Sequence, residues 1–231
     1  MSESTMILTE ENGILRLTMN APSNNLMTAD FFRDYEAVMA EIENRAGDKS
    51  VKGLIICGAG RHFSTGADVA ALADRSADEA YDDADGKLPA GHIRQKHYFT
   101  FLRSLPFPTV SAVTGFCIGS GSEIAVNCHY RVIEKGARIG QPESTFGILP
   151  ALGGVARTIE ICGMKNAYEL VMSGELIPAE QAYELGWADI FAGKKQSIPE
   201  AEKLIEFIAE KGGFTPEAHR SFIKLYKEES V

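Results

Sequence analysis

Two glutamates in the middle of the chain belong to a residue type that acid–base chemistry uses. Glu123 comes just after a Gly-Ser-Gly sequence at 119–121, in what we expect to be the first turn of a helix. Glu143 follows Pro142 at the expected end of a strand. If the fold brings the two carboxyl groups together, one can accept a proton while the other delivers one, provided that burial raises their pKa values.

Glycine-rich turns surround both glutamates and predict hydrogen-bond donors for a developing negative charge. They lie in three segments: RHFSTGADV at 61–69, TGFCIGSGSEIA at 114–125 and IGQPESTFGILPALGG at 139–154. Small residues let a ligand approach the backbone closely, and a helix N-terminus offers unpaired N–H groups with a favourable dipole. Two such turns can form an oxyanion hole with two donors beside the carboxylates.

Other catalytic motifs do not match this sequence. A Gly-Ala-Gly at 58–60 follows an expected strand, but position 63 is Phe where a dinucleotide fingerprint has its third glycine, and no G-x-x-x-x-G-K-[ST] occurs. The nucleophile pattern G-x-S-x-G also fails, because His and Ile occupy its first glycine position before Ser64 and Ser120. Nucleotide binding and triad hydrolysis are therefore not supported.

The cysteines and histidines form no metal-binding pattern. The four cysteines lie far apart without a C-x-x-C pair, so we expect reduced, mostly buried thiols rather than a zinc site or disulfides. The five histidines are scattered, and we expect them to be solvated or hydrogen-bonded. Only His62 lies next to a candidate oxyanion turn. The sequence predicts no metal site.

Composition and charge exclude several classes of protein. The 231 residues (25.1 kDa) are 45% hydrophobic and 24% charged, which is typical of one globular domain, or of one domain with a short helical tail. With 23 basic and 32 acidic residues the formal charge is −9, so we expect no nucleic-acid partner. MSESTMILTE lacks the pattern of a signal peptide, and no apolar run reaches the roughly 18 residues of a membrane span. We therefore expect a soluble, cytoplasmic protein.

The hydrophobic pattern predicts a layered α/β core that begins with a hairpin. Residues 6–19 form two β-rich runs joined by Asn12-Gly13, and a helix is expected to begin after an N-cap at Thr28. Buried strands are expected at 51–57 and 109–113, and a second strand pair at 131–139 around Lys135-Gly136. On the buried face of the first helix we expect Phe32, Tyr35, Met39, Ile42 and Ala46.

The last third of the chain is mostly helical by the same criteria. We expect helices near 154–163, 165–173, 178–185, 199–211 and 216–229. Residues 74–85 contain six acids and one arginine without a clear apolar period, which predicts a mobile acidic surface loop.

The glycine-rich segments resemble the crotonase (enoyl-CoA hydratase/isomerase) superfamily. Family members have F-x-x-G-A-D-[ILV], then G-x-x-x-G-x-G-x-E-[IL], then G-x-P-E with L-P-x-x-G-G soon after, and this chain has them all in order. The resemblance covers residues from about 6 to about 190. It implies an α/β, crotonase-like fold, in which a spiral core of repeated ββα units (1–192) precedes a short C-terminal helical tail (193–231).

The resemblance also implies a function, that of an enoyl-CoA hydratase-like lyase in fatty acid metabolism. The backbone N–H groups of Ala67 and Ser120 would form the oxyanion hole for an enoyl thioester. Glu123 would orient and deprotonate the water that attacks C3, and Glu143 would deliver a proton to C2. We expect a coenzyme A thioester as substrate, no metal or redox cofactor, and assembly into a homotrimer or a dimer of trimers. Bordering the substrate we place Thr65, Gly66, Asp68 and Gly119, with Asp68 in a turn- or cap-forming role.

The chain departs from the family pattern at three places. The second oxyanion position, usually glycine, is Ser120, and the family's two phosphate-binding lysines are replaced by Ser23 and Ala70. By the same resemblance, we expect a C-terminal helical tail shorter than the family's usual one, since the sequence given runs to Val231.

These departures leave two alternatives open: an enoyl-CoA isomerase or other crotonase-type acyl-CoA reaction, and a non-catalytic acyl-thioester-binding subunit. We expect CoA rather than an acidic carrier protein as the acyl carrier, held by a few cations such as Arg16, Arg61 or Lys87.

Overall fold

The structure, a computed structural model, describes residues 4–69 and 90–212, together with Ala218 and Ser221. It opens with the predicted hairpin, in which β1 (Met6–Glu11) pairs antiparallel with β2 (Ile14–Met19). Asn12 and Gly13 both have positive φ, 54° and 80°, as a two-residue hairpin turn requires. The Asn-Gly signal is therefore confirmed.

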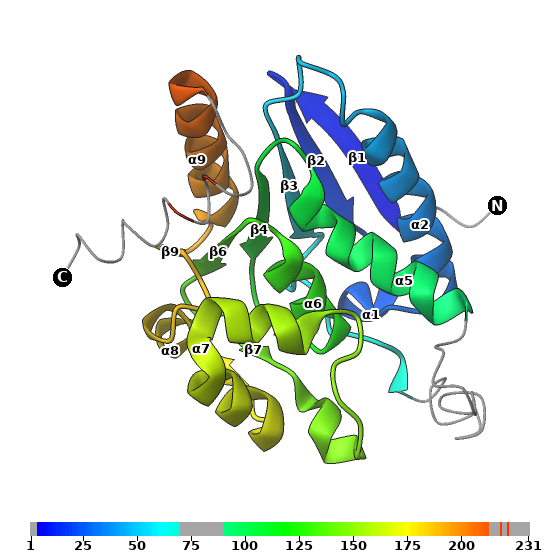
Figure 1. Cartoon of the computed structure of the whole chain (residues 1–231), viewed down its shortest axis with the longest axis vertical. Coiled ribbons are helices and arrows are strands. Elements are labelled where there is room, and N and C mark those ends of the chain that lie inside the picture. Colours follow the sequence, from blue (N-terminus) through cyan, green and yellow to red (C-terminus); the bar gives the residue numbers. More distant parts are fainter. Residues whose placement is uncertain (1–3, 70–89, 213–217, 219–220, 222–231) are drawn as a thin grey trace.

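A six-stranded sheet forms the centre of the molecule (Figure 1). Its order is β1-β2-β3-β4-β6-β9, and all its pairs after the hairpin are parallel. The added strands are β3 (Gly53–Gly58), β4 (Thr109–Val113), β6 (Tyr130–Glu134) and β9 (Ile190–Ala192). Strands 51–57 and 109–113 are thus confirmed as buried strands, close to their predicted bounds.

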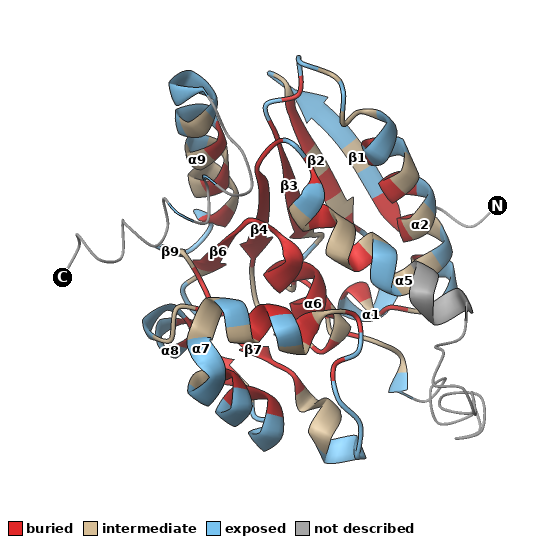
Figure 2. Cartoon of the chain, in the orientation of Figure 1, coloured by how far each residue is buried: buried red, intermediate tan, exposed pale blue. Residues whose placement is uncertain are grey.

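Helices cover both faces of this sheet, which explains why β3 is apolar at every position. Leu54 and Ile56 belong to the larger core cluster, whereas Ile55 and Cys57 belong to a second cluster with Ile205 of α9 (Ser197–Lys211). Alternate residues of a strand point to opposite faces, so both sets must be apolar. Figure 2 shows the resulting buried centre, with β3, β4 and α6 red throughout most of their length.

On the larger core, α2 (Ala29–Asn44) packs beside α5 (Ala90–Thr100) (Figure 1). Thr28 is the N-cap, as predicted, and its side chain accepts a hydrogen bond from the N–H of Phe31. The predicted face was one residue off at its start: Phe31 is fully buried, whereas Phe32 is half-buried against Phe99. The buried residues Tyr35, Val38 and Ile42 follow Phe31 at three- and four-residue spacing, and the predicted Ala46 lies beyond the end of the helix at Asn44.

A second, three-stranded sheet has the order β5-β7-β8, with β5 (Phe116–Ile118), β7 (Arg138–Gly140) and β8 (Ile177–Pro178). The strand pair predicted at 131–139 is wrong, because β6 joins the large sheet and β7 joins this one. Arg138 instead lies opposite Phe116. The turn at Lys135-Gly136 carries the chain between two sheets, and a local turn signal does not say which strands pair.

Three short elements follow the strands and carry the candidate site. The turn α1 (Pro22–Asn25) follows β2, α6 (Ser120–Asn127) follows β5, and the 3₁₀ helix η2 (Pro142–Phe146) follows β7. A further 3₁₀ helix, η1 (Phe101–Ser104), continues α5 toward β4. Each of the first three lies at the carboxyl end of a strand, where parallel sheets place their functional groups.

The C-terminal helices agree with the sequence prediction where the structure describes them. The helix α7 (Gly154–Ser173) covers both ranges predicted at 154–173, with a break in the helical backbone at Gly163, and α8 (Ala179–Glu184) and α9 follow. The predicted helix at 216–229 and the acidic loop at 74–85 lie outside the described residues, and the division at residue 192 stays a prediction. Within the described ranges, no helix is long and apolar enough to cross a membrane.

Candidate active site

Glu123 lies in the first turn of α6 and is 2% exposed. Its Oε1 accepts hydrogen bonds from the backbone N–H groups of Leu152, at 2.7 Å, and Gly154, at 3.0 Å. A methyl group on Gly154 would lie 2.7 Å from Cγ of Glu123, which no side chain tolerates. The Leu-Pro-x-x-Gly-Gly motif therefore holds one oxygen of this carboxyl group through two backbone N–H groups.

Glu143 lies in the first turn of η2 and approaches the same end of α6. A methyl group on Gly119, the residue before α6, would lie 3.2 Å from Oε1 of Glu143. Its Oε2 is buried and has no hydrogen-bond partner among the described residues. The second glycine-rich motif thus places Glu123 inside the helix and leaves room for Glu143 beside its N-terminus.

Burial gives both carboxyl groups raised pKa values. The pKa of Glu123 rises to about 8 because the group is desolvated and, in second place, because Glu143 is close enough to repel its charge. The two N–H groups that bind Oε1 oppose this rise. Burial also raises the pKa of Glu143. Groups whose pKa values are raised in this way can hold a proton at a higher pH than an ordinary carboxyl group, which is what acid–base chemistry requires.

Ala67, the first predicted oxyanion donor, lies in a short parallel bridge with Met27. Met27 donates to the carbonyl of Gly66 at 2.8 Å, and Asp68 donates to the carbonyl of Met27 at 3.3 Å. In this pattern Met27 is hydrogen-bonded to Gly66 and Asp68, the two neighbours of Ala67. Because alternate backbone groups point to opposite sides, the N–H of Ala67 points away from Met27. The amide of Ala67 is therefore turned to the opposite side of the segment.

Ser120, the second predicted donor, is the first residue of α6. It is half-buried, and Gly119 before it has φ 54° and ψ −126°, a conformation suited to glycine. Gly66 packs so closely on this turn that a methyl group there would lie 2.7 Å from the carbonyl oxygen of Ile118. The residues just before Ala67 and Ser120 are thus in contact, which places the two amides at one end of α6.

The other residues assigned from the sequence lie on the same segments. Thr65 donates from Oγ1 to the carbonyl of Ser23, at 3.2 Å, and Gly66 has φ 85° and is buried. Asp68 is half-buried and Gly119 is buried. The structure brings all four beside the two donor amides.

The remaining sequence expectations concern histidine, cysteine and metal. His62 is hydrogen-bonded as expected: its Nδ1 accepts from the N–H of Phe116 at 2.9 Å, and its ring stacks on that of Phe116. No disulfide joins any of the four cysteines, and three of them are buried. In the part of the chain that the structure describes, no group of three or more His, Cys, Asp or Glu residues is placed to hold a metal ion.

Two uncharged residues of the site were missed from the sequence. Gln141 is fully buried, and neither its amide oxygen nor its amide nitrogen has a hydrogen-bond partner among the described residues. A methyl group on Gly154 would lie 2.6 Å from Nε2 of Gln141 and 2.8 Å from Oε1 of Glu123, so both side chains border the same glycine. It adds a neutral donor and acceptor beside Glu123. Asn25, the other, lies in α1 and donates to carbonyl groups of the loop that leads to Ala67. Neither has a signal in the sequence beyond its closeness to a motif.

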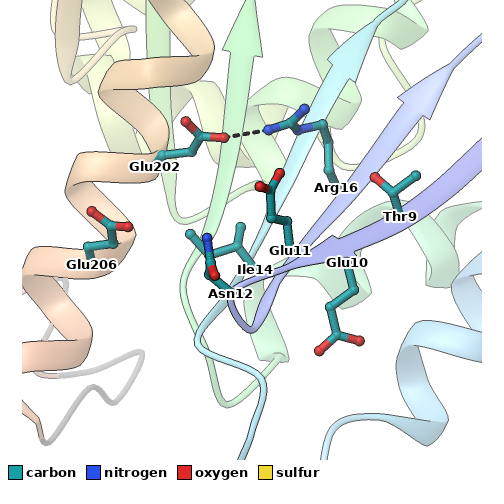
Figure 3. A pocket seen from close by; sticks show the side chains of 8 residues that line it. All are labelled: Thr9, Glu10, Glu11, Asn12, Ile14, Arg16, Glu202 and Glu206. Carbon is teal, nitrogen blue, oxygen red and sulfur yellow. Dashed lines mark hydrogen bonds and ion pairs between the residues drawn. The ribbon is translucent and has the colours of Figure 1, made fainter.

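A separate hollow lies between the hairpin and α9 (Figure 3). Its carboxylates come from Glu10, Glu11, Glu202 and Glu206, and Arg16 forms an ion pair with Glu202 there. Arg16 was expected to be one of the cations available to CoA, and in the structure it pairs with Glu202 of α9. Arg61 is exposed near the first donor segment, and Lys87 lies outside the described residues.

The match to known proteins agrees with this arrangement. The profile of the enoyl-CoA hydratase/isomerase family matches residues 9–228, nearly the whole chain. The chain belongs to the enoyl-CoA hydratase/isomerase family. The crotonase resemblance read from the motifs is thereby confirmed.

Curated members of the family include hydratases and longer proteins. The chain is 30% identical over 214 residues to a crotonyl-CoA hydratase of Syntrophomonas wolfei, covering 92% of this chain and 78% of that one. It is 31% identical over 230 residues to a fatty acid oxidation complex subunit alpha of Shewanella amazonensis, covering 91% of this chain but only 31% of the relative. The chain therefore spans about a third of the length of such alpha subunits.

Solved structures show the same fold. An enoyl-CoA hydratase from Bacillus anthracis superposes with a TM-score of 0.79 at 21% identity, covering 96% of this chain and 82% of that one. A putative enoyl-CoA hydratase from Thermobifida fusca, solved with CoA, superposes with a TM-score of 0.75 at 22% identity, covering 98% and 86%. The predicted crotonase-like α/β fold is confirmed.

Proposed function

We propose that this member of the enoyl-CoA hydratase/isomerase family adds water across the C2–C3 double bond of an enoyl-CoA thioester. The observation that carries the proposal is the pairing of the buried Glu123 with Glu143, which is half-buried and has a buried Oε2, at the N-terminus of α6. Crotonyl-CoA and short-chain-enoyl-CoA hydratases among the relatives support it. Both carboxyl groups being present favours hydration over isomerisation, since a proton shuttle between two carbons requires only one base.

The oxyanion hole acts on the thioester carbonyl. As hydroxide adds to C3, negative charge moves through C2 onto the thioester oxygen. The N–H groups of Ala67 and Ser120 would donate to that oxygen, and each such donor is worth roughly 3 kcal/mol in the transition state. The N-terminus of α6 adds its dipole in the same direction. These backbone groups would stabilise the enolate, and the two glutamate side chains would move the protons. We propose that no metal or redox cofactor takes part.

The two carboxyl groups divide the proton transfers. Oε1 of Glu123 is held by two backbone N–H groups, which stabilise the ionised form against the larger effect of burial. With a pKa of about 8, a minority of Glu123 is ionised at neutral pH, and we assign that form as the base that takes the proton of water. Oε2 of Glu143 is buried without a partner among the described residues, which favours the protonated form, so we assign Glu143 as the acid that protonates C2. One turnover leaves the proton on Glu123, and it must return to Glu143 before the next.

The test is turnover of crotonyl-CoA, followed by loss of the enoyl absorbance and identification of 3-hydroxybutyryl-CoA as the product. A shifted double bond as the only product would assign the chain to isomerisation, and thioester binding without turnover would make it a binding subunit. Addition of a chelator is expected to leave the rate unchanged. Crotonyl-pantetheine and a crotonyl carrier protein, assayed at equal concentration, test the carrier, and much faster turnover of the carrier protein would refute the choice of CoA.

We also propose that the chain assembles with copies of itself, as a homotrimer or a dimer of trimers. Met164, Tyr168 and Met172 are 65%, 63% and 48% exposed and recur every four residues on α7. An exposed apolar stripe of this kind is typical of an interface. Light scattering measures the assembly, and a lone monomer at micromolar concentration would contradict it.

A further inference from the structure

The turn α1 has a backbone that non-glycine residues rarely adopt. Ser23, Asn24 and Asn25 are consecutive and left-handed, with φ of 55°, 64° and 62°. Asparagine tolerates this region better than most residues, but three in succession persist only where the surroundings impose the conformation. The partners of this turn show what imposes it.

Asn25 binds the loop that leads into the first oxyanion segment. It is 1% exposed, and its Nδ2 lies 3.2, 2.9 and 3.1 Å from the carbonyl oxygens of Ala59, His62 and Phe63. Its Oδ1 accepts from the N–H of Ala21 at 3.1 Å. A single buried amide thus holds three carbonyl groups of one loop, and the left-handed turn is what aims it there.

The backbone of Asn25 continues this contact toward Ala67. Ser64 donates from Oγ to the carbonyl of Asn25 at 2.7 Å and accepts at the same Oγ from the N–H of Gly66 at 3.1 Å. Ser64 also packs on α6, because a methyl group on Gly121 would lie 2.8 Å from its Cβ. These contacts therefore reach Gly66, the residue before Ala67, and Gly121, the residue after Ser120.

We propose that Asn25 is a positioning residue, which sets the amide of Ala67 relative to the amide of Ser120 and so fixes the width of the oxyanion hole. The inference rests on the proposed function, since it takes these amides as the donors. Asn25 itself touches neither substrate nor reacting atoms. Because transition-state stabilisation depends on donor placement, a shift of about 1 Å can lower the rate by up to about 100-fold.

The test compares Asn25→Gly with Asn24→Gly. Both variants remove an asparagine side chain from the same left-handed turn and leave a residue that accepts positive φ. Asn24 is exposed, and its side chain makes no hydrogen bond in the described part of the chain, so Asn24→Gly is the matched control. Folding is checked by circular dichroism, and rates are measured well below the melting temperature of each variant.

Two readouts separate positioning from a purely structural role. The first is kcat for crotonyl-CoA: Asn25→Gly is expected to lower it about 10- to 100-fold with KM changed less than about threefold, while Asn24→Gly stays within about twofold of wild type. The second is the infrared stretch of the thioester carbonyl in bound butyryl-CoA, labelled with ¹³C at that carbonyl. Butyryl-CoA has no C2–C3 double bond and therefore does not react. Hydrogen bonds lower this frequency, and Asn25→Gly is expected to reverse part of the lowering.

The outcomes distinguish the inference from the proposed function. Asn25→Gly with a lower melting temperature but unchanged kcat and carbonyl stretch overturns the positioning role. No lowering of the carbonyl stretch in wild type refutes the oxyanion hole itself. If Asn25→Gly does not fold, Ser64→Ala removes only the Oγ link, and it is expected to lower kcat about threefold or more and to shift the carbonyl stretch. An unchanged stretch and rate in that variant also overturn the inference.

Discussion

Replacing Glu123 by glutamine should show two effects separately: how much the buried carboxyl group lowers the free energy of unfolding, and how much it contributes to the rate of hydration. The folded state holds the pKa of Glu123 at about 8, against an ordinary value of 4.5. Between these two pH values the unfolded chain loses this proton while the folded chain keeps it. The free energy of unfolding therefore falls as pH rises from 4.5 to about 8, and the contribution is fully present only below 4.5.

The magnitude follows from the same pKa difference. At about 1.4 kcal/mol per pH unit, it amounts to at most about 5 kcal/mol, and we expect about 3–5 kcal/mol after local relaxation. Glutamine keeps an oxygen for the N–H groups of Leu152 and Gly154 but does not titrate. Glu123→Gln should thus be more stable than wild type by about 3–5 kcal/mol at pH 9 and within about 1 kcal/mol of it at pH 5.

The assay is urea unfolding at pH 5, 7 and 9, with hydration of crotonyl-CoA measured on the same samples. Glu41→Gln, at an exposed position in the last turn of α2, is the control. Activity of Glu123→Gln should fall by roughly 10²–10⁴-fold at pH 9, where the wild-type base is ionised, and by a smaller factor at pH 5, where the wild-type carboxyl group is protonated. An equal stability difference at pH 5 and pH 9 would refute the reasoning about burial, whatever the activity shows.

Three further predictions concern the acid, the glycine motif and the sheet. Glu143→Gln should lower hydration by roughly 10²–10⁴-fold while thioester affinity, measured by calorimetry, changes little; unchanged turnover would remove Glu143 from the mechanism. Gly154→Ala should lower kcat and cost about 1–3 kcal/mol of stability, because its methyl group would lie 2.8 Å from Oε1 of Glu123, whereas Gly47→Ala, with open space around it, should do neither. Asp189→Ala should cost about 3–5 kcal/mol, since it leaves the buried guanidinium of Arg131 without its carboxylate, and the kcat of the folded fraction should not change.

Much of this molecule follows from local chemistry in the sequence. Asn12-Gly13 specifies the hairpin because few other dipeptides accept positive φ twice, and Thr28 specifies the start of α2 because its side chain binds a free N–H group. The glycines at 66 and 154 mark points where backbone or buried side chains crowd out a Cβ, and Gly119 has a positive φ with the carboxyl group of Glu143 close beside it. Motifs built on such steric limits are short and keep fixed spacing, so residue order alone is enough to locate Glu123 and Glu143.

The tertiary structure decided the relations between distant segments. Strand order sends β6 and β7 into different sheets and places Arg16 opposite Glu202, and no local signal contains this information, because pairing depends on the packing of the whole core. Burial likewise raises the pKa of Glu123 through groups brought together from separate segments. Asn25 and Gln141 are neutral residues whose meaning depends entirely on their neighbours. The sequence by itself determined which groups can do chemistry; only the folded chain determined how far apart they lie, because distance between segments is a property of packing.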